Sequence, residues 1–197
     1  MQRAPLDKII LDTKMLDMGP PKEILALAMD PPNLLNIKNT VLHLKDMGAL
    51  LPTVSKTNPD TGVLERQYSK EDGDLTVLGQ LVASMPIDVR LGKLVVLGHL
   101  FNVLEESIII AAGLSTKSIF AFPFDKKEKA YANKLLWSNK SFSDCLAVLM
   151  AYQVWKDKMM TGFFSRRGRN EAQWCRERFL QLKALRELGE NNFRIDD

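Results

Sequence analysis

The chain has 197 residues, and 46% of them are hydrophobic, which supplies enough apolar surface for one large domain or two small domains with buried cores. This composition excludes an intrinsically disordered chain. The formal net charge of +3 is compatible with nucleic-acid binding but is far from the strongly basic balance of a dedicated nucleic-acid-binding protein, so charge alone leaves the partner open.

Three helices are predicted at the start of the chain. The first begins near Leu6 and stops at Gly19, and the prolines that follow suit the first turn of a second helix over residues 21–29. Asn33 can cap a third helix, which Gly48 ends. The apolar residues of this third helix recur on one face, namely Leu34, Ile37, Val41, Leu44 and Met47.

A short β-hairpin is predicted next. The polar segment 55–62 has the chemistry of a turn and separates two apolar stretches with strand character, around Val54 and around Leu64. A second loop, residues 70–74, then leads into a helix over residues 76–84. Three helices followed by a hairpin is the element order of a winged helix.

From Pro86 onward only helical spacing is visible. The apolar residues of segment 89–104 are too dense for a surface helix, and residues 108–112 are nearly all apolar, so both segments are expected to be buried in a helical bundle. The isoleucine-rich run is also compatible with a strand. Further helices are expected over residues 126–137, 143–159 and 170–188.

Metal binding, secretion and membrane insertion are not expected. Cys145 and Cys175 are isolated, and His43 and His99 lie far from both in the sequence, so no zinc-binding set can be proposed. The isolated cysteines suit a reduced, intracellular setting. The N-terminal segment carries charges and no continuous apolar core, which fits neither a signal peptide nor a membrane span.

Several short motifs follow one another along the chain, including Arg3-Ala4-Pro5-Leu6, Asp74-Leu75-Thr76-Val77-Leu78-Gly79 and Ala111-Ala112-Gly113-Leu114-Ser115. This order resembles the helicase-associated region of DEAH-box RNA helicases, in which a segment that ends in Leu-Thr-x-Leu-Gly closes a winged helix. The downstream motifs are most similar to the tudor-domain-containing germline branch, the spindle-E type. Many splicing DEAH helicases carry Gly-Asp-His where this chain has Ser143-Asp144-Cys145, which argues against a splicing helicase.

The resemblance implies a mainly α fold in two domains. Residues 1–85 would form a winged-helix domain of three helices plus a small β-hairpin wing, and residues 86–197 would form a ratchet-like helical bundle. In DEAH helicases the winged helix packs on the motor lobes and, in some members, receives a glycine-rich activator peptide. Protein docking is therefore the role that the resemblance gives to this first domain.

ATP hydrolysis by this segment is not expected. A DEAH motor needs a Gly-x-x-x-x-Gly-Lys-Ser/Thr phosphate loop and an Asp-Glu-Ala-His motif, whereas Gly92-Lys93 is the only Gly-Lys pair here and Leu94 follows it. We therefore expect no catalytic residue, no metal and no cofactor in this segment. ATP and magnesium would bind motor lobes that lie upstream in a parent ATP-dependent RNA helicase.

The resemblance also implies partners and a cellular role. The segment would contact single-stranded RNA without reading its sequence and would pack on the motor lobes of the same chain. The spindle-E type is associated with piRNA-guided transposon silencing, in the cytoplasm and in perinuclear germline granules, or nuage. The alternative is a protein–protein interaction platform that recruits the helicase to these granules by binding a peptide or a granule protein.

Arginines near the C-terminal end give the first candidate RNA contact. Arg166, Arg167 and Arg169 stand without an intervening acid, and their guanidinium groups match phosphate oxygens in geometry. Arg176, Arg178, Lys183 and Arg186 continue this positive segment. The alternative is a solvated helix face in which arginines pair with Glu171 and Glu177.

Two further candidates are polar and aromatic. Ser143 and Asp144 start a predicted helix whose free backbone amides attract phosphate, although simple capping by Ser143 or Ser141 is the alternative. Phe163, beside the arginines, is the aromatic residue that we expect to stack on an unpaired base. The alternative for any aromatic residue of this half is a place in the core; the set comprises Phe120, Phe122, Phe124, Trp137, Tyr152, Trp155, Phe163, Phe164 and Trp174.

Overall fold

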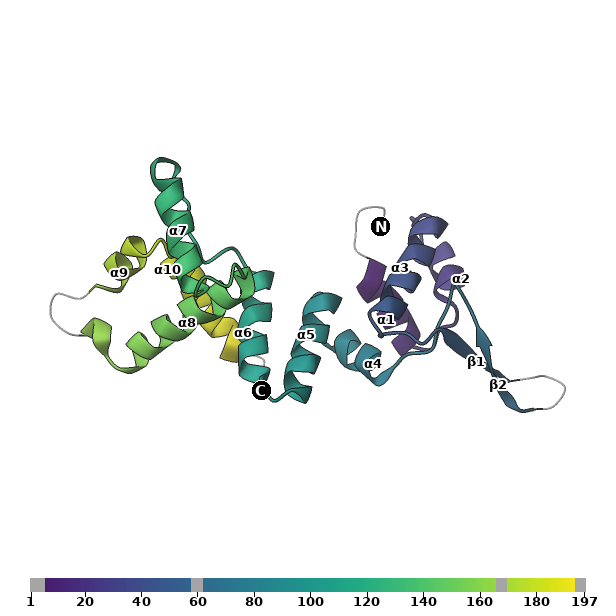
Figure 1. Cartoon of the computed structure of the whole chain (residues 1–197). Helices are drawn as coiled ribbons and strands as arrows, with labels where there is room; N and C mark the ends of the chain where they lie inside the picture. Colours follow the sequence, from purple (N-terminus) through teal and green to yellow (C-terminus); the bar gives the residue numbers. More distant parts are fainter. Residues whose placement is uncertain (1–5, 58–61, 166–169, 194–197) are drawn as a thin grey trace. The chain divides into compact units, whose positions relative to one another are not determined.

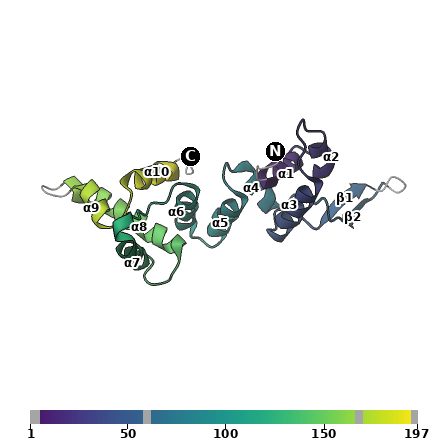
Figure 2. The same cartoon turned by 90° about the horizontal axis from the view of Figure 1, so that it is seen from above.

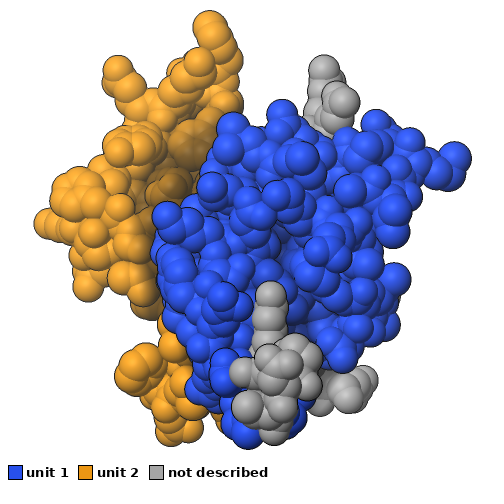
Figure 3. Space-filling view, turned by 90° about the vertical axis from the view of Figure 1, so that its right-hand side faces the viewer, with its two compact units in different colours: residues 1–96 blue, residues 97–197 orange. Residues whose placement is uncertain are grey.

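The structure is a computed structural model that describes residues 6–57, 62–165 and 170–193. The chain forms two compact units, unit 1 (Met1–Val96) and unit 2 (Leu97–Asp197), which Figure 3 distinguishes by colour. Their boundary falls inside helix α5 (Val89–Leu100), later in the chain than the division after residue 85 that the sequence predicts. The predicted division rests on motif order and stays a prediction.

Unit 1 begins with the three expected helices, α1 (Leu6–Met15), α2 (Pro21–Ala26) and α3 (Leu34–Asp46). Asn33 caps α3, since its side chain accepts a hydrogen bond of 2.8 Å from the Leu35 amide. Helix α2 ends before Met29, because Leu27 already serves as its C-cap. The apolar faces of these helices form the core of unit 1, whose fully buried members include Ile10, Leu11, Ile37, Val41 and Leu44.

The predicted hairpin is confirmed by strands β1 (Thr53–Thr57) and β2 (Leu64–Tyr68), which pair antiparallel from Thr53 opposite Tyr68 to Thr57 opposite Leu64 (Figure 1). All five residues of β2 are exposed to solvent. The hairpin therefore extends from the helical core as a wing and confirms the winged-helix arrangement of unit 1.

The segment Asp74–Gly79 explains how the wing is tied to helix α4 (Val77–Ser84). The Asp74 carboxylate accepts hydrogen bonds from the Ser55 amide at 2.8 Å and from its hydroxyl at 2.7 Å. Thr76 caps α4 by accepting from the Gly79 amide at 2.9 Å and donates to the Gly48 carbonyl at 2.7 Å. Each polar residue of the motif thus joins two elements of unit 1.

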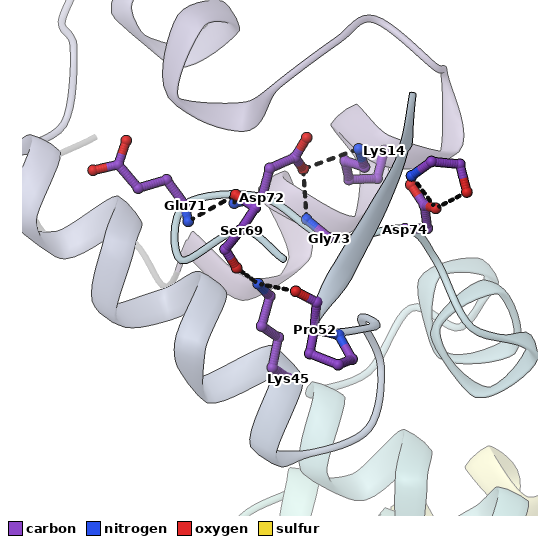
Figure 4. A network of polar contacts seen from close by, with 9 residues as sticks. Lys14, Lys45, Pro52, Ser69, Glu71, Asp72, Gly73 and Asp74 are labelled. Carbon is purple, nitrogen blue, oxygen red and sulfur yellow. Dashed lines mark hydrogen bonds and ion pairs between the residues drawn. The ribbon is translucent and has the colours of Figure 1, made fainter. Parts of the chain in front are cut away.

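A polar network fixes the loop that follows β2 (Figure 4). Asp72 is buried, pairs with Lys14 of α1 at 3.0 Å and accepts from the Gly73 amide at 2.8 Å. Lys45 of α3 donates to the carbonyl oxygen of Ser69. Burial lowers the pKa of Lys45, and the nearby Asp72 carboxylate opposes that shift. The network connects the wing to two helices.

Unit 2 is helical within its described residues. Helix α8 packs against α6 and α7, and α10 packs against α6 (Figure 1, Figure 2). The deeply buried side chains of its core include Ile109, Ile119, Ala151, Tyr152, Leu185 and Leu188. Its helices are α6 (Leu104–Ser115), α7 (Lys127–Trp137), α8 (Asp144–Met160), α9 (Glu171–Glu177) and α10 (Leu182–Phe193), with short 3-10 turns η1 (Phe124–Lys126) and η2 (Phe163–Ser165). The isoleucine-rich run lies in α6 and is therefore helical, not a strand.

One predicted helix is wrong. The sequence predicts a single helix over residues 170–188, but the structure has α9 and α10 with a break between them. Phe179 adopts a positive φ of 53° at the break, and the Gln181 amide donates to the Ile119 carbonyl at 2.8 Å. Leu180 is buried and forms an isolated antiparallel bridge with Phe120. This pairing with a distant segment overrides the helical spacing.

A second prediction is wrong in part. Val89 and Val95 are buried as expected, but Leu100 and Phe101 are 71% and 75% exposed. Helix α5 ends at Leu100, and Asn102 turns the chain with a φ of 60° before α6 begins. The end of the apolar run therefore lies on the surface of the turn.

Candidate nucleic-acid interface

The predicted arginine cluster lies outside the described residues, so the roles of Arg166, Arg167 and Arg169 stay predictions. Its continuation is described. Arg186 pairs with Glu171, which raises the pKa of Arg186, and Arg178 lies 3.6 Å from Glu177. The Glu–Arg pairing that we considered as the alternative is therefore confirmed for these two arginines.

Two cations of the same region are differently placed. Among the described residues no ion pair involves Arg176 or Lys183, and both are exposed. They line an open groove of about 910 Å³ beside α9 and α10, together with Lys117. Its other charged lining residues are Arg186, Glu187 and Glu190, and its apolar lining residues include Leu180, Leu182 and Ala184. The groove therefore combines cationic groups that can bind an anion with a partly apolar lining.

Ser143 and Asp144 begin helix α8 as predicted. The Ser143 hydroxyl accepts from the Leu146 amide at 3.3 Å, so the capping interpretation is confirmed. Asp144 is exposed and pairs with Lys134 of α7 at 2.7 Å. This ion pair joins the start of α8 to α7. Each of the two side chains therefore has a structural role within unit 2. A contact of either residue with RNA stays a prediction.

Phe163 is half-buried against the core of unit 2. Its ring lies edge-on to Phe164 at a centroid distance of 5.3 Å, and the Lys158 ammonium lies 4.4 Å from the ring centroid. Phe164 in turn contacts Trp174 edge-on at 5.7 Å. The geometry favours the core alternative for Phe163, and its stacking on RNA stays a prediction.

The exposed aromatic residues of unit 2 lie elsewhere. Phe124 is 88% exposed and Tyr131 is 57% exposed, and Phe142 is also on the surface. The Lys127 ammonium lies 4.5 Å from the centroid of the Phe124 ring. Sequence reasoning placed Phe124 in a general aromatic set and did not single out Tyr131. The signal that the sequence offers is their spacing. Phe124, Lys127 and Tyr131 follow one another at intervals of three and four residues, as residues on one side of a helix do.

The two cysteines differ in burial, and neither belongs to a metal-binding cluster of the described residues. Within residues 6–57, 62–165 and 170–193 there is no cluster of histidine, cysteine and acidic residues that could hold a metal ion. Cys175 is buried, and burial raises the pKa of its thiol to about 11, with a smaller contribution from the Glu171 carboxylate. Cys175 is therefore a structural residue and not a nucleophile.

This difference predicts selective thiol modification. At pH 8 a thiol reagent such as DTNB should modify the partly exposed Cys145 first, because a pKa raised from 9.0 to about 11 lowers the thiolate fraction of Cys175 roughly a hundredfold. The absorbance of the released thionitrobenzoate gives the two reaction rates. The fast phase should disappear in Cys145→Ser. Denaturation should make both thiols fast. Equal rates in the folded chain would contradict the burial of Cys175.

No helix in the described part of the chain is both long enough and apolar enough to span a bilayer.

Comparison with known proteins gives consistent similarities. Residues 88–187 match the family model of the helicase associated domain (HA2), ratchet-like. The chain is 45% identical over 189 residues to the probable ATP-dependent RNA helicase spindle-E of Aedes aegypti, which covers 95% of this chain and 13% of that protein. It is 43% identical over 190 residues to the human ATP-dependent RNA helicase TDRD9, which covers 96% of this chain and 13% of that protein. The chain thus spans about an eighth of the length of these relatives.

Proposed function

This chain belongs to the helicase-associated (HA2), ratchet-like family, and we propose on that basis that it is the non-catalytic accessory module of an ATP-dependent RNA helicase of the spindle-E and TDRD9 type. In this proposal the motor lobes of the parent protein bind ATP and magnesium. The module lines the path of a single-stranded RNA and contacts its phosphates without reading sequence. The parent protein acts in piRNA-guided transposon silencing, in cytoplasmic germline granules.

The observation that carries the RNA-binding part is the groove beside α9 and α10. Arg176 and Lys183 are exposed, have no acidic partner among the described residues and line the same opening as Lys117. Charge-assisted contacts of such cations with phosphate are independent of base identity. The groove therefore supports sequence-indifferent binding, in which the predicted arginines 166, 167 and 169 would take part.

We expect the 197-residue chain to bind a single-stranded oligonucleotide more weakly as salt increases. Three phosphate contacts would give a log–log slope of roughly −2, since each contributes about −0.7 on a single strand. Replacing Lys117, Arg176 and Lys183 by Ala should weaken binding and flatten that slope, as measured by fluorescence anisotropy at several salt concentrations. The same assay applied to Arg166→Ala/Arg167→Ala/Arg169→Ala tests the predicted cluster.

A matched control removes the same charge from unit 1. Arg66, Lys70 and Arg90 are exposed, and their replacement by Ala should leave both affinity and salt slope near those of the parent chain. If the control triple weakens binding as much as the groove triple, net charge and not the groove determines the affinity. Binding that does not depend on salt would refute phosphate contact altogether.

The second candidate function is a protein-interaction platform. The observation that favours it is a set of exposed apolar residues at the end of α5 and in the turn that follows, namely Leu97, Leu100, Phe101 and Val103. Contiguous exposed apolar surface is typical of protein interfaces. A specific peptide complex together with no measurable RNA affinity would favour this function over the first, and Phe101→Asp should then abolish the complex.

A further inference from the structure

The surface of η1 and α7 carries two exposed rings and a lysine in helical register. Phe124 is 88% exposed, and Lys127 places its ammonium 4.5 Å from the centroid of that ring. Tyr131 follows Lys127 by one helical turn, so both lie on the same side of α7. We call Phe124, Lys127 and Tyr131 the α7 aromatic face.

Other residues of α7 make the contacts that hold the helix in place. Ala130 is buried, and Trp137 packs against the core with its ring centroid 6.4 Å from that of Trp174. Lys134 pairs with Asp144 and lies over the Phe120 ring at 5.4 Å. Since these residues supply the packing of α7 while the rings of Phe124 and Tyr131 stay exposed, the α7 aromatic face is not needed for the core of unit 2.

We propose that the α7 aromatic face stacks on unpaired bases of single-stranded RNA, an inference that rests on the proposed function and adds a second kind of contact to it. Every base presents a π-face, so stacking on Phe124 and Tyr131 is tolerant of sequence. Bases of a duplex are already stacked on each other, and the face therefore selects a single strand.

The charges around the face favour RNA over an apolar protein partner. The exposed lysines 126, 127 and 129 flank the rings, against the acids Asp125 and Glu128. An apolar partner that covered both rings would bury the Lys127 ammonium group, which has no ion pair among the described residues, and burying an unpaired charge is costly. A nucleotide meets the same surface with a flat base and a phosphate, and so satisfies both the rings and the lysines.

The test uses the 197-residue chain and two labelled probes. One is an oligouridylate of about ten nucleotides, a length within the usual range of single-strand binding sites. The other is an abasic ribose-phosphate oligomer of equal length. The parent chain should bind the oligouridylate more tightly than the abasic probe. Phe124→Ala/Tyr131→Ala should remove this preference, with a loss of about fivefold or more for each stacked base. The salt slope should stay unchanged, because no phosphate contact is lost. Circular dichroism melting checks that the variant is folded.

The control double variant removes the same two ring types elsewhere. Tyr68→Ala/Phe101→Ala changes exposed residues outside the face and should bind both probes like the parent chain. The conservative pair Phe124→Tyr/Tyr131→Phe keeps both rings and should retain the preference for the oligouridylate.

The outcomes separate this inference from the proposed function. If the parent chain binds neither probe, the proposed RNA binding fails and the stacking site fails with it. If the parent chain binds both probes equally, or if Phe124→Ala/Tyr131→Ala binds the oligouridylate as tightly as the parent chain does, phosphate contact stands and the stacking site alone is refuted. A double variant that loses a protein partner and keeps its full RNA affinity would refute the stacking site in favour of a protein contact.

Discussion

Gly79→Ala is expected to destabilise unit 1 strongly, although alanine is the better helix former. A Cβ at this position would overlap the carbonyl oxygen of Ala49 and lie 3.0 Å from the carbonyl carbon. That oxygen accepts a hydrogen bond from the Thr76 amide at 3.1 Å, so it cannot withdraw without breaking the contact that starts α4. Overpacking of about 1–3 kcal/mol and a lost hydrogen bond of about 1 kcal/mol outweigh a helix-propensity gain of about 1 kcal/mol.

Urea denaturation can assign this loss to unit 1. All three tryptophans, Trp137, Trp155 and Trp174, belong to unit 2, so their fluorescence reports on that unit, whereas circular dichroism reports on both. Gly79→Ala should move the circular dichroism transition to a lower urea concentration, which corresponds to a free energy of unfolding lower by about 1–3 kcal/mol. The fluorescence transition should stay in place. Equal shifts in both signals would show that the two units unfold together.

Gly92→Ala is the matched control in the same unit. Its nearest neighbour would be a Val82 methyl group at 3.1 Å, and a side-chain methyl can shift where a backbone carbonyl cannot. We therefore expect a loss smaller than for Gly79→Ala, and part of it should be offset by the higher helix propensity of alanine. If both variants lose the same stability, the close approach of Gly79 to the Ala49 carbonyl is not the cause.

Local sequence signals predicted much of this fold. Asn33 was predicted as a cap, and Ser143 or Ser141 as another, because a capping side chain acts on amides two or three residues away; Asn33 and Ser143 are the caps in the structure. The hairpin followed from turn chemistry between two apolar stretches in the same way. These elements were accessible because the residues that determine them are neighbours in the chain.

The missed features depend on residues that are distant in sequence. The break before α10 is set by pairing of Leu180 with Phe120, and helical spacing alone gives no sign of that pairing. The exposure of Leu100 and Phe101 was also missed, because apolar spacing indicates which side of a helix is apolar but not whether another element covers that side. Tertiary context decides both.

The candidate site was likewise predictable from the sequence only in part. Charge could be located from the sequence, and the groove beside α9 and α10 includes Arg176 and Lys183 of the predicted positive segment. Choosing the exposed ring could not be done from composition, because Phe163 and Phe124 are both aromatic residues beside cations. The structure separates them: Phe163 packs on the core, and Phe124 is on the surface.

Replacement of Gly113 in α6 should disturb the packing of unit 2, because this glycine lies against two other helices. A Cβ there would overlap a methyl group of Val148 in α8 and lie 3.1 Å from a methyl group of Leu188 in α10. Val148 is buried and β-branched, so it has few alternative rotamers, and Leu188 is fully buried. The methyl of alanine therefore forces α6 away from both partners.

We expect a graded loss for substitutions at this position. Gly113→Ala should lower the free energy of unfolding by about 1–2 kcal/mol, because overpacking is partly offset by helix propensity. Relative to alanine, valine at this position adds two further methyl groups and has a poorer helix propensity, so Gly113→Val should cost about 3 kcal/mol or more. Tryptophan fluorescence during urea denaturation measures both values, since every tryptophan lies in this unit.

Gly189→Ala in α10 is the control for this prediction. Its Cβ would meet only ordinary contacts, the nearest being the Tyr152 hydroxyl oxygen at 3.6 Å, so alanine should be neutral or stabilise the helix by up to about 1 kcal/mol. Loss of RNA binding by Gly113→Val, together with full binding by Gly189→Ala, would connect the packing of α6 against α8 and α10 to the presentation of the groove. Equal stability of Gly113→Val and the parent chain would show that α6 can move away without cost and would refute the tight packing inferred at Gly113.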